Sequence, residues 1–353
     1  MSPATLSRIA PREQQIGWAA RPVTLGDFVD ASGLRSVVLG ASKDPNAKVT
    51  VLLVSDAVGE PVLAVKVPTT DDAARAVLAE ARVLDALGTL EDHLLETVPR
   101  GTDLVEFGGR PALVTTALQG VPMSTLYLRP RHTRSPARVA ADFSAAARWL
   151  AAFQGATAHE STPLELAEEV ESRLRARFSG DDSIEGNLAR LREIDLRLRR
   201  NTVPRTAVHG DLWFGNLLVS DGRISGVVDW EEGALSGQPV RDLVRFANMY
   251  ALYLDHRTRE GRRVAGHRGM RAGPWGAGVA FALDGDGWFP ELYRGFLAEG
   301  LARLGASPQS WRDAALAGLA EVAAFTDDPE FSRRHLELFR RVAYARGGEG
   351  GAA

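Results

Sequence analysis

The chain has 353 residues, of which 45% are hydrophobic and 25% are charged, a composition typical of a folded protein that buries two cores or one large one. Its 42 Lys and Arg residues against 45 Asp and Glu residues give a net charge of -3, which offers no general attraction to nucleic acid or to an anionic membrane. The absence of cysteine excludes disulfides, thiolate metal sites and cysteine nucleophiles. No apolar run has the length of a signal peptide or a membrane span, so we expect a cytoplasmic protein without nucleic-acid or membrane partners.

Three β-rich runs occupy residues 35–40, 49–55 and 61–68, and the turn-forming stretches between them predict a three-stranded meander. The third run carries Lys66 between apolar residues. Apolar residues then recur at helical spacing after an acidic first turn over residues 71–87, which predicts a helix that includes Glu80. This part of the chain should therefore form a sheet accompanied by one helix.

The following segments become mainly helical. Residues 111–116 form one more strand-like run, whereas residues 135–158 place apolar side chains at the spacing of a helix with a buried face. Residues 164–200 are charged and punctuated by leucine, which predicts a solvated helical hairpin. Residues 346–353 consist mainly of glycine and alanine, and we expect a flexible tail there.

The most informative motif lies at residues 209–216, which read His-Gly-Asp-Leu-Trp-Phe-Gly-Asn and are followed by Val-Val-Asp-Trp. Five positions separate Asp211 from Asn216, and thirteen separate Asn216 from Asp229. Kinase-type enzymes have these intervals between the catalytic base, a magnesium-binding amide and a magnesium-binding carboxylate. The spacing therefore predicts a phosphoryl-transfer site that uses ATP and Mg2+.

A β-hairpin explains how these side chains meet. Residues 217–219 and 224–228 are short apolar runs on either side of an Asp-Gly turn. Successive pairing away from that turn sets Asn216 beside Val227, so Asn216 and Asp229 should emerge near one point. An amide carbonyl and a carboxylate are hard oxygen ligands suited to Mg2+, and ATP phosphates would complete its coordination shell.

These motifs resemble the aminoglycoside phosphotransferase and choline-kinase-like branch of the protein-kinase superfamily, over roughly residues 36–246. Typical protein kinases have His-Arg-Asp and Asp-Phe-Gly where this chain has His-Gly-Asp and Asp-Trp-Glu. The resemblance implies an α+β, protein-kinase-like fold of two lobes with ATP between them. The N-lobe, an antiparallel sheet plus a helix, would comprise residues 1–118, and the mainly helical C-lobe would comprise residues 119–345.

The resemblance also implies catalytic roles. Asp211 would be the base, with His209 and Asn216 as its companions in the catalytic loop. Asn216 and Asp229 would bind the metal. Asp242, in the stretch Gly-Gln-Pro-Val-Arg-Asp-Leu, would brace the catalytic loop through backbone hydrogen bonds, although Gln238 replaces the aspartate that the family has earlier in this stretch.

Nucleotide-binding residues follow from the same resemblance. Lys66 would grip the ATP phosphates, and Glu80 would pair with it and orient it. Thr116, Ala117 and Leu118 lie where the hinge that holds adenine is expected. Residues 40–48, between the first two strands, lack a Gly-x-Gly-x-x-Gly pattern, so no phosphate contacts are assigned to them.

Two basic segments bear on the acceptor. Residues 129–138 contain four arginines and a histidine, and residues 257–271 contain six arginines and His267. They are either solvated faces or the frame of an acceptor site, in which Arg262 and Arg263 would favour an anionic or neutral hydroxyl compound. Glu231, close after Asp229, would instead suit an amine.

We therefore predict an ATP- and Mg-dependent phosphotransferase that moves the γ-phosphate to a hydroxyl of a small molecule, such as a sugar, an amino alcohol or an antibiotic-like metabolite. Two alternatives stay open: a kinase acting on Ser or Thr of a peptide in natural-product maturation, and a catalytically silent nucleotide-binding protein. The chain has all of the residues that catalysis would require, which argues against a catalytically silent protein: Lys66, Glu80, Asp211, Asn216 and Asp229. The acceptor, the choice between ATP and GTP, and the oligomeric state stay open.

Overall fold

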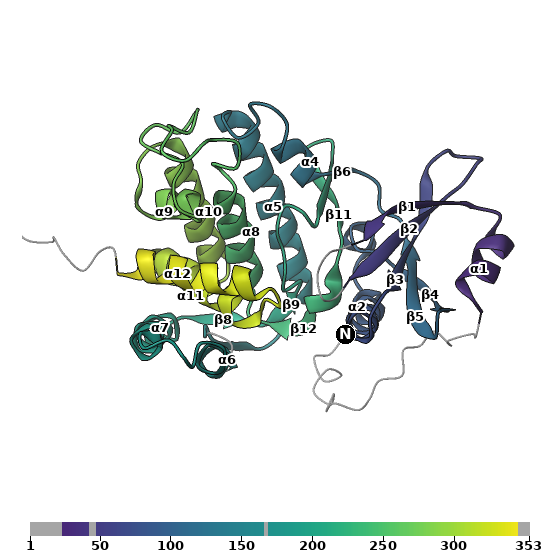
Figure 1. Cartoon of the computed structure of the whole chain (residues 1–353), viewed down its shortest axis with the longest axis horizontal. Helices are drawn as coiled ribbons and strands as arrows, with labels where there is room; N and C mark the ends of the chain where they lie inside the picture. Colours follow the sequence, from purple (N-terminus) through teal and green to yellow (C-terminus); the bar gives the residue numbers. More distant parts are fainter. Residues whose placement is uncertain (1–22, 42–46, 166–168, 345–353) are drawn as a thin grey trace, which may run out of the picture. The chain divides into compact units, whose positions relative to one another are not determined.

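The structure, a computed structural model, describes residues 23–41, 47–165 and 169–344. This part of the chain forms two compact units. The first contains the residues up to Thr89 together with Pro99–Ala117, and the second contains Leu90–Val98 and the residues from Leu118 onward. An antiparallel sheet dominates the first unit and helices dominate the second (Figure 1), which confirms the predicted α+β fold class.

The expected ranges had placed residues 90–98 in the first lobe. In the structure they belong to the second unit, where Thr97 accepts hydrogen bonds from a strand and a helix of that unit. Its carbonyl oxygen accepts from the Val227 N–H at 2.8 Å, and its hydroxyl accepts from Trp149 Nε1 at 3.0 Å. The predicted tail at residues 346–353 lies outside the described residues.

The first unit comprises α1 (Leu25–Ser32), β1 (Arg35–Ala41), β2 (Lys48–Val54), β3 (Pro61–Pro68), α2 (Asp71–Leu87), β4 (Gly101–Phe107) and β5 (Arg110–Thr116). Its sheet has the order β1-β2-β3-β5-β4, and each neighbouring pair is antiparallel. These bounds confirm the predicted meander, the later strand-like run and the predicted helix. Residues 42–46, within the loop where no glycine pattern was found, lie outside the described residues.

The core of the first unit forms because β2 and β3 alternate buried and less buried side chains, as a half-buried sheet does, while β5 buries residues 112–115 in succession. Val65, Val67 and Val114 are buried together in one cluster. Helix α2 begins at its cap, where the Thr70 side chain accepts from the Ala73 N–H at 3.1 Å, and it packs against the sheet. This packing sets one face of α2 beside β3.

The second unit comprises α3 (Asp92–Leu95), β6 (Val121–Pro122), α4 (Met123–Tyr127), α5 (Pro136–Thr157), β7 (Ser161–Pro163), α6 (Glu169–Arg177), α7 (Ile184–Leu198), β8 (Thr202–Pro204), β9 (Thr206–Val208), β10 (Leu217–Ser220), β11 (Arg223–Val227), η2 (Trp230–Glu232), β12 (Ala234–Gly237), α8 (Val240–Leu252), α9 (Ala277–Asp284), α10 (Trp288–Arg303), η3 (Pro308–Ser310), α11 (Trp311–Phe325) and α12 (Pro329–Ala343). Helices α5, α8 and α10 pack side by side, and α11 joins them through α8 and α10 (Figure 1).

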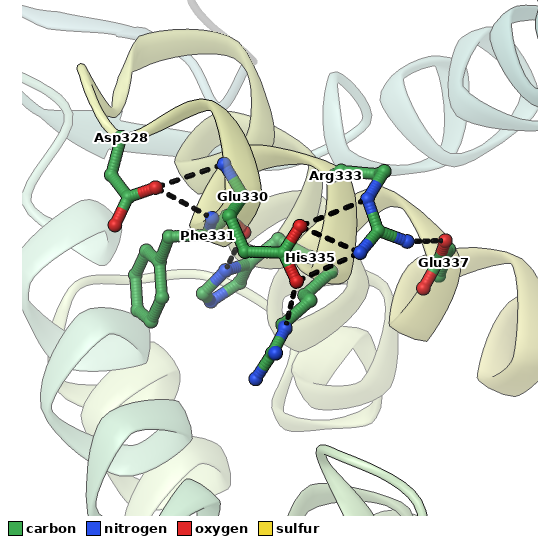
Figure 2. A network of polar contacts seen from close by, with 7 residues as sticks. Asp328, Glu330, Phe331, Arg333, His335 and Glu337 are labelled. Carbon is green, nitrogen blue, oxygen red and sulfur yellow. Dashed lines mark hydrogen bonds and ion pairs between the residues drawn. The ribbon is translucent and has the colours of Figure 1, made fainter.

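Helix α12 shows how surface and core divide on one element. Asp328 caps its first turn, and Arg333 binds Glu330 and Glu337 on the solvent side (Figure 2). On the opposite side, Leu338 and Phe339 are buried. None of the helices in the described ranges combines the length and the apolar character that a membrane span requires.

The β10–β11 hairpin forms around the predicted Asp-Gly turn, with positive φ at Asp221 and Gly222. Its register differs from the expected one, because Leu217 rather than Asn216 lies opposite Val227. A bulge at Ser225 causes the shift, and the Ser225 hydroxyl donates to the Gln119 carbonyl at 2.7 Å.

Candidate active site

Lys66 and Glu80 form a close ion pair in the first unit. Lys66 Nζ lies 2.6 Å from Oε1 and 2.7 Å from Oε2 of Glu80. The two side chains are only 11% and 1% exposed, respectively. Both groups are largely removed from water, so their mutual attraction is screened little. The pair holds the ammonium group at one place above β3.

Asp242, at the start of α8, braces the motif loop in the second unit. Its carboxylate accepts from the His209 N–H at 2.7 Å and from the Gly210 N–H at 2.9 Å. Burial raises the pKa of Asp242, while the nearby His209 ring and these two backbone donors oppose the rise. Gly210 is required here, since its φ is 83° and a Cβ atom would lie 2.2 Å from the Glu232 carbonyl oxygen.

His209 is fully buried, and both of its ring nitrogens are engaged. Nε2 donates to the Val228 carbonyl at 2.9 Å, and Nδ1 accepts from the Asp211 N–H at 3.2 Å. The ring also packs on Trp230, with centroids 4.7 Å apart. These contacts connect the loop that carries Asp211 to the strand end that carries Asp229. His209 therefore positions the loop, and its ring has no access to a substrate.

Asp211 is held by a residue that the sequence analysis did not select. Arg245, on α8, donates from Nε to Asp211 Oδ1 at 2.8 Å. The Asp211 side chain stays 32% exposed, whereas that of Arg245 is 16% exposed. Arg245 lies one helical turn after Asp242, so both face the motif loop; this i, i+3 spacing is the signal that could have identified it.

Asn216 faces Asp211 through its amide nitrogen. Nδ2 donates to the Asp211 carbonyl oxygen at 3.0 Å and approaches Asp211 Oδ2 at 3.3 Å. This leaves the amide oxygen directed away from Asp211. The backbone carbonyl of Asn216 accepts from the Val228 N–H at 3.0 Å, so Asp229 follows directly after the residue paired with Asn216. The bulge thus moves Asn216 one residue closer to Asp229 than the sequence predicted.

Asp229 adopts a left-handed backbone conformation, with φ 66° and ψ 62°. Such a conformation is strained for a residue other than glycine and persists only where its surroundings fix it. The next residue supplies that anchor: Trp230 is fully buried and donates from Nε1 to the Val227 carbonyl at 2.8 Å. An amide oxygen and a carboxylate, on two adjoining strand ends, fit the hard-oxygen preference of Mg2+.

Two aromatic side chains lie near the motif loop: Trp213 belongs to the loop, and Tyr253 follows the end of α8. Trp213 folds back over Gly215, where a Cβ atom would lie 2.3 Å from the indole ring. Its ring centroid is 6.4 Å from that of Tyr253, and both side chains are partly exposed. Burial is the main cause that raises the pKa of Tyr253. The charge of Arg245 opposes this rise, and the charge of Asp211 adds to it. Neither ring was predicted to lie at the site.

Two of the predicted hinge residues already use their backbone N–H groups within the protein. The Thr116 N–H donates to Arg100 and the Ala117 N–H donates to Val62, both within the first unit. A nucleotide would therefore have to use other groups of this stretch. Leu118 begins the second unit, where its side chain lies against Gly226.

The predicted acceptor residues lie on different elements. Glu231 is in η2, directly after Trp230, and is partly buried. Arg262 and Arg263 are exposed on an ordered hairpin, in which the Ala272 N–H donates to the Arg262 carbonyl at 2.9 Å. The basic segment is therefore a structured element of the second unit.

Comparison with known proteins identifies the family of the chain. The sequence profile of the family described as "Phosphotransferase enzyme family" matches residues 46–275, well over half of the chain. A search of curated proteins found no match.

Solved aminoglycoside phosphotransferases have a similar fold. A thermostable variant of APH(4)-Ia in its apo form is 15% identical, with a TM-score of 0.54 over 91% of this chain and 99% of that one. ADP-bound APH(2'')-Ib is 13% identical, with a TM-score of 0.51 over 90% and 96% of the respective chains. The chain therefore belongs to the phosphotransferase enzyme family and has the protein-kinase-like fold of aminoglycoside phosphotransferases.

Proposed function

We propose that this phosphotransferase transfers the γ-phosphoryl group of ATP to a hydroxyl of a small molecule, with Asp211 as the base. The observation that carries the proposal is the anchoring of Asp211. One carboxylate oxygen, Oδ1, is held by Arg245. Within the described residues, the other oxygen, Oδ2, has only the 3.3 Å approach of Asn216, and the side chain is partly exposed. Oδ2 is thus the atom that would face an acceptor hydroxyl.

In the proposed reaction the acceptor oxygen forms a bond to the γ-phosphorus as the bond from that phosphorus to the bridging β,γ-oxygen breaks. The hydroxyl proton passes to Asp211 Oδ2, and ADP leaves. The protein forms no covalent bond in this reaction. The rate therefore depends mainly on how the acceptor and the phosphate are positioned and on how the charge of the transition state is stabilised. The hydrogen bonds from the loop to Asp242 and the contact of Arg245 with Asp211 provide that positioning.

Magnesium, when bound, would neutralise charge on the ATP phosphates. Asn216, through its amide oxygen, and Asp229, through its carboxylate, are the residues that would hold it. The fixed backbone at Asp229 and the commitment of Asn216 Nδ2 to Asp211 support this assignment. Lys66, oriented by Glu80, would contact the ATP phosphates from the first unit.

A small-molecule acceptor is favoured by two observations. Trp213 and Tyr253 form a partly exposed aromatic pair, and Tyr253 lies within electrostatic reach of Asp211; such a pair suits the face of a ring such as a sugar. One similar structure, a variant of APH(4)-Ia, was crystallised with ADP and hygromycin B; it is 13% identical with a TM-score of 0.53. We infer the same class of acceptor, a hydroxylated small molecule.

The test is a mass-spectrometric screen. The protein, with ATP and Mg2+, is incubated with pools of hydroxylated metabolites and of peptides, and the product is recognised by the gain of one phosphate. The proposal expects a phosphorylated small molecule that is absent from reactions with the Asp211→Asn variant. Phosphorylation confined to Ser or Thr of peptides would instead support the peptide-kinase alternative.

A further inference from the structure

We propose that the second unit carries a binding surface for an acidic polypeptide segment, formed by its two arginine-rich stretches. The basic surface is defined as the side chains of Arg129, Arg131, Arg134 and Arg138 together with those of Arg257, Arg259, Arg262, Arg263, Arg268 and Arg271. All ten are exposed. The proposal concerns recognition and holds whether or not the polypeptide is itself phosphorylated.

The two stretches are separated widely in sequence, yet they lie against each other. His267 Nε2 donates to the Thr133 carbonyl at 2.8 Å. Gly266 passes so close to Arg134 that a Cβ atom would lie 2.7 Å from the Arg134 Cα atom. Because backbone contacts backbone here, the arginines that flank these residues belong to one surface.

The later stretch is a rigid platform. Its arms pair as a hairpin, with the Gly261 N–H bonded to the Ala272 carbonyl at 2.7 Å and the Val264 N–H bonded to the Met270 carbonyl at 3.0 Å. Val264 and Met270 are buried beneath it. His267 is also buried and stacks on Trp288, with centroids 5.0 Å apart. The hairpin thus buries its apolar residues, and its paired arms hold a fixed backbone from which the arginines extend into solvent.

In the part of the chain that the structure describes, these arginines have no carboxylate partner, unlike Arg175 and Arg197 of the same unit. Arg175 binds Glu171 and Glu185, and Arg197 binds Asp313 through two hydrogen bonds. Across the ranges that the structure describes, no arginine of the basic surface forms an ion pair with a carboxylate. Only one acidic residue, Glu260, lies within the two stretches. On a chain whose net charge is negative, this leaves a concentrated positive field that favours an anionic partner.

The composition of the surface favours carboxylates on a polypeptide over nucleic acid. Arginine forks bind carboxylates through two parallel hydrogen bonds. Single-stranded nucleic acid is usually held by aromatic rings on which the bases stack, and neither arginine stretch contains Phe, Tyr or Trp. Ten guanidinium groups spread over two segments also exceed what one small metabolite could contact. An extended acidic segment is opposite in charge to the basic surface and is long enough to contact both of its arginine stretches.

The test measures fluorescence anisotropy of a labelled oligoglutamate peptide of about ten residues, which spans roughly 30 Å when extended. We expect binding at low salt that weakens steeply as salt is added. The double variant Arg262→Glu/Arg263→Glu should lose at least about tenfold in affinity. Its matched control is Arg200→Glu/Arg223→Glu, which makes the same charge change at two exposed arginines of this unit outside the basic surface, and it should bind like the wild type.

Several outcomes would overturn the proposal: no binding at low salt, equal weakening by both double variants, or tighter binding of a single-stranded oligonucleotide than of oligoglutamate. If the first variant is unfolded by circular dichroism, Arg129→Gln/Arg134→Gln/Arg138→Gln replaces it and must show the same loss. Binding is also measured for Asp211→Asn, which should equal the wild type. Failure of the catalytic proposal would therefore leave peptide binding intact, and failure of this one would leave small-molecule phosphorylation intact.

Discussion

Arg245 donates from Nε to Oδ1 of Asp211 at 2.8 Å and approaches the same oxygen through Nη2. The contact comes from α8, the helix whose first turn contributes Asp242 to the motif loop. One helix therefore fixes the backbone of the loop through Asp242 and the reactive side chain through Arg245. This relationship makes Arg245 a positioning residue for the proposed base.

Replacing Arg245 by Ala should lower kcat roughly ten- to hundredfold with little change in KM for ATP, because the carboxylate loses its fixed orientation while nucleotide contacts stay. Arg245→Lys keeps the charge and should recover part of the loss. Arg241→Ala is the matched control, since Arg241 is on the same helix but lies over the Phe325 ring, 5.6 Å from its centroid. Equal kcat values for the two alanine variants would exclude this role for Arg245.

Gly210→Ala should destabilise the fold severely, because the new Cβ atom would meet the Glu232 carbonyl at 2.2 Å in a backbone with φ 83°. We expect a loss of more than about 3 kcal/mol in the free energy of unfolding. Gly222→Ala provides the comparison: φ is 71° there, but no atom lies within 4 Å, so the strain alone should cost about 1 kcal/mol. Urea denaturation of both variants checks the difference, which a similar midpoint for the two would contradict.

Asp229→Ala should abolish magnesium-dependent ATP turnover, whereas Asn216→Ala should weaken turnover and raise the magnesium requirement. A charged ligand contributes more to binding Mg2+ than a neutral amide does. Ser220→Ala, at the turn end of the same hairpin, is the control. Magnesium titrations of turnover measure the effect, and curves that coincide for all three variants and the wild type would refute the metal assignment.

His335 should make the protein sensitive to acid. Its pKa is lowered from 6.5 to about 3, first by burial and also by the charge of Arg245, while its hydrogen bond to the Phe331 carbonyl opposes the shift (Figure 2). Between pH 6.5 and pH 3 the unfolded chain binds a proton that the folded chain does not. The contribution of His335 to the free energy of unfolding is therefore complete above pH 6.5. It is lost as the pH falls toward 3, by about 1.4 kcal/mol per pH unit.

The measurement is the free energy of unfolding of the wild type and of His335→Gln between about pH 7 and pH 4. This range begins above the ordinary pKa of histidine and ends well below it. The slope with pH, rather than the absolute stability, should be smaller in the variant. His93→Gln removes an exposed histidine and serves as the control. A variant slope as steep as that of the wild type would show that His335 is not the group responsible.

Much of the fold and part of the site followed from local sequence patterns. The alternation of β2 and β3, the helical stripe of α2 and the Asp-Gly turn are short-range signals, so their elements could be predicted. The pairing of Lys66 with Glu80 was implied by the family resemblance, and the two side chains form that ion pair in the structure. The two backbone bonds to Asp242 likewise agree with the bracing role that the resemblance implied.

Other features depend on contacts that no local pattern encodes. The bulge at Ser225 shifts the hairpin register because the Ser225 hydroxyl meets Gln119, more than a hundred residues earlier. The Arg245 contact required knowing which face of α8 meets the motif loop. The hairpin at residues 257–271 was not predicted from this glycine-containing sequence, in which Gly261, Gly266 and Gly269 supply the positive φ angles that its turns need.

The most direct test of the central claim is single-turnover phosphorylation by Asp211→Asn, with the acceptor found in the metabolite screen. The amide keeps an oxygen for Arg245 but is far too weak a base to take the hydroxyl proton. The account predicts unchanged ATP affinity and a phosphorylation rate lower by roughly two to four orders of magnitude. A rate within a few fold of the wild type would contradict it.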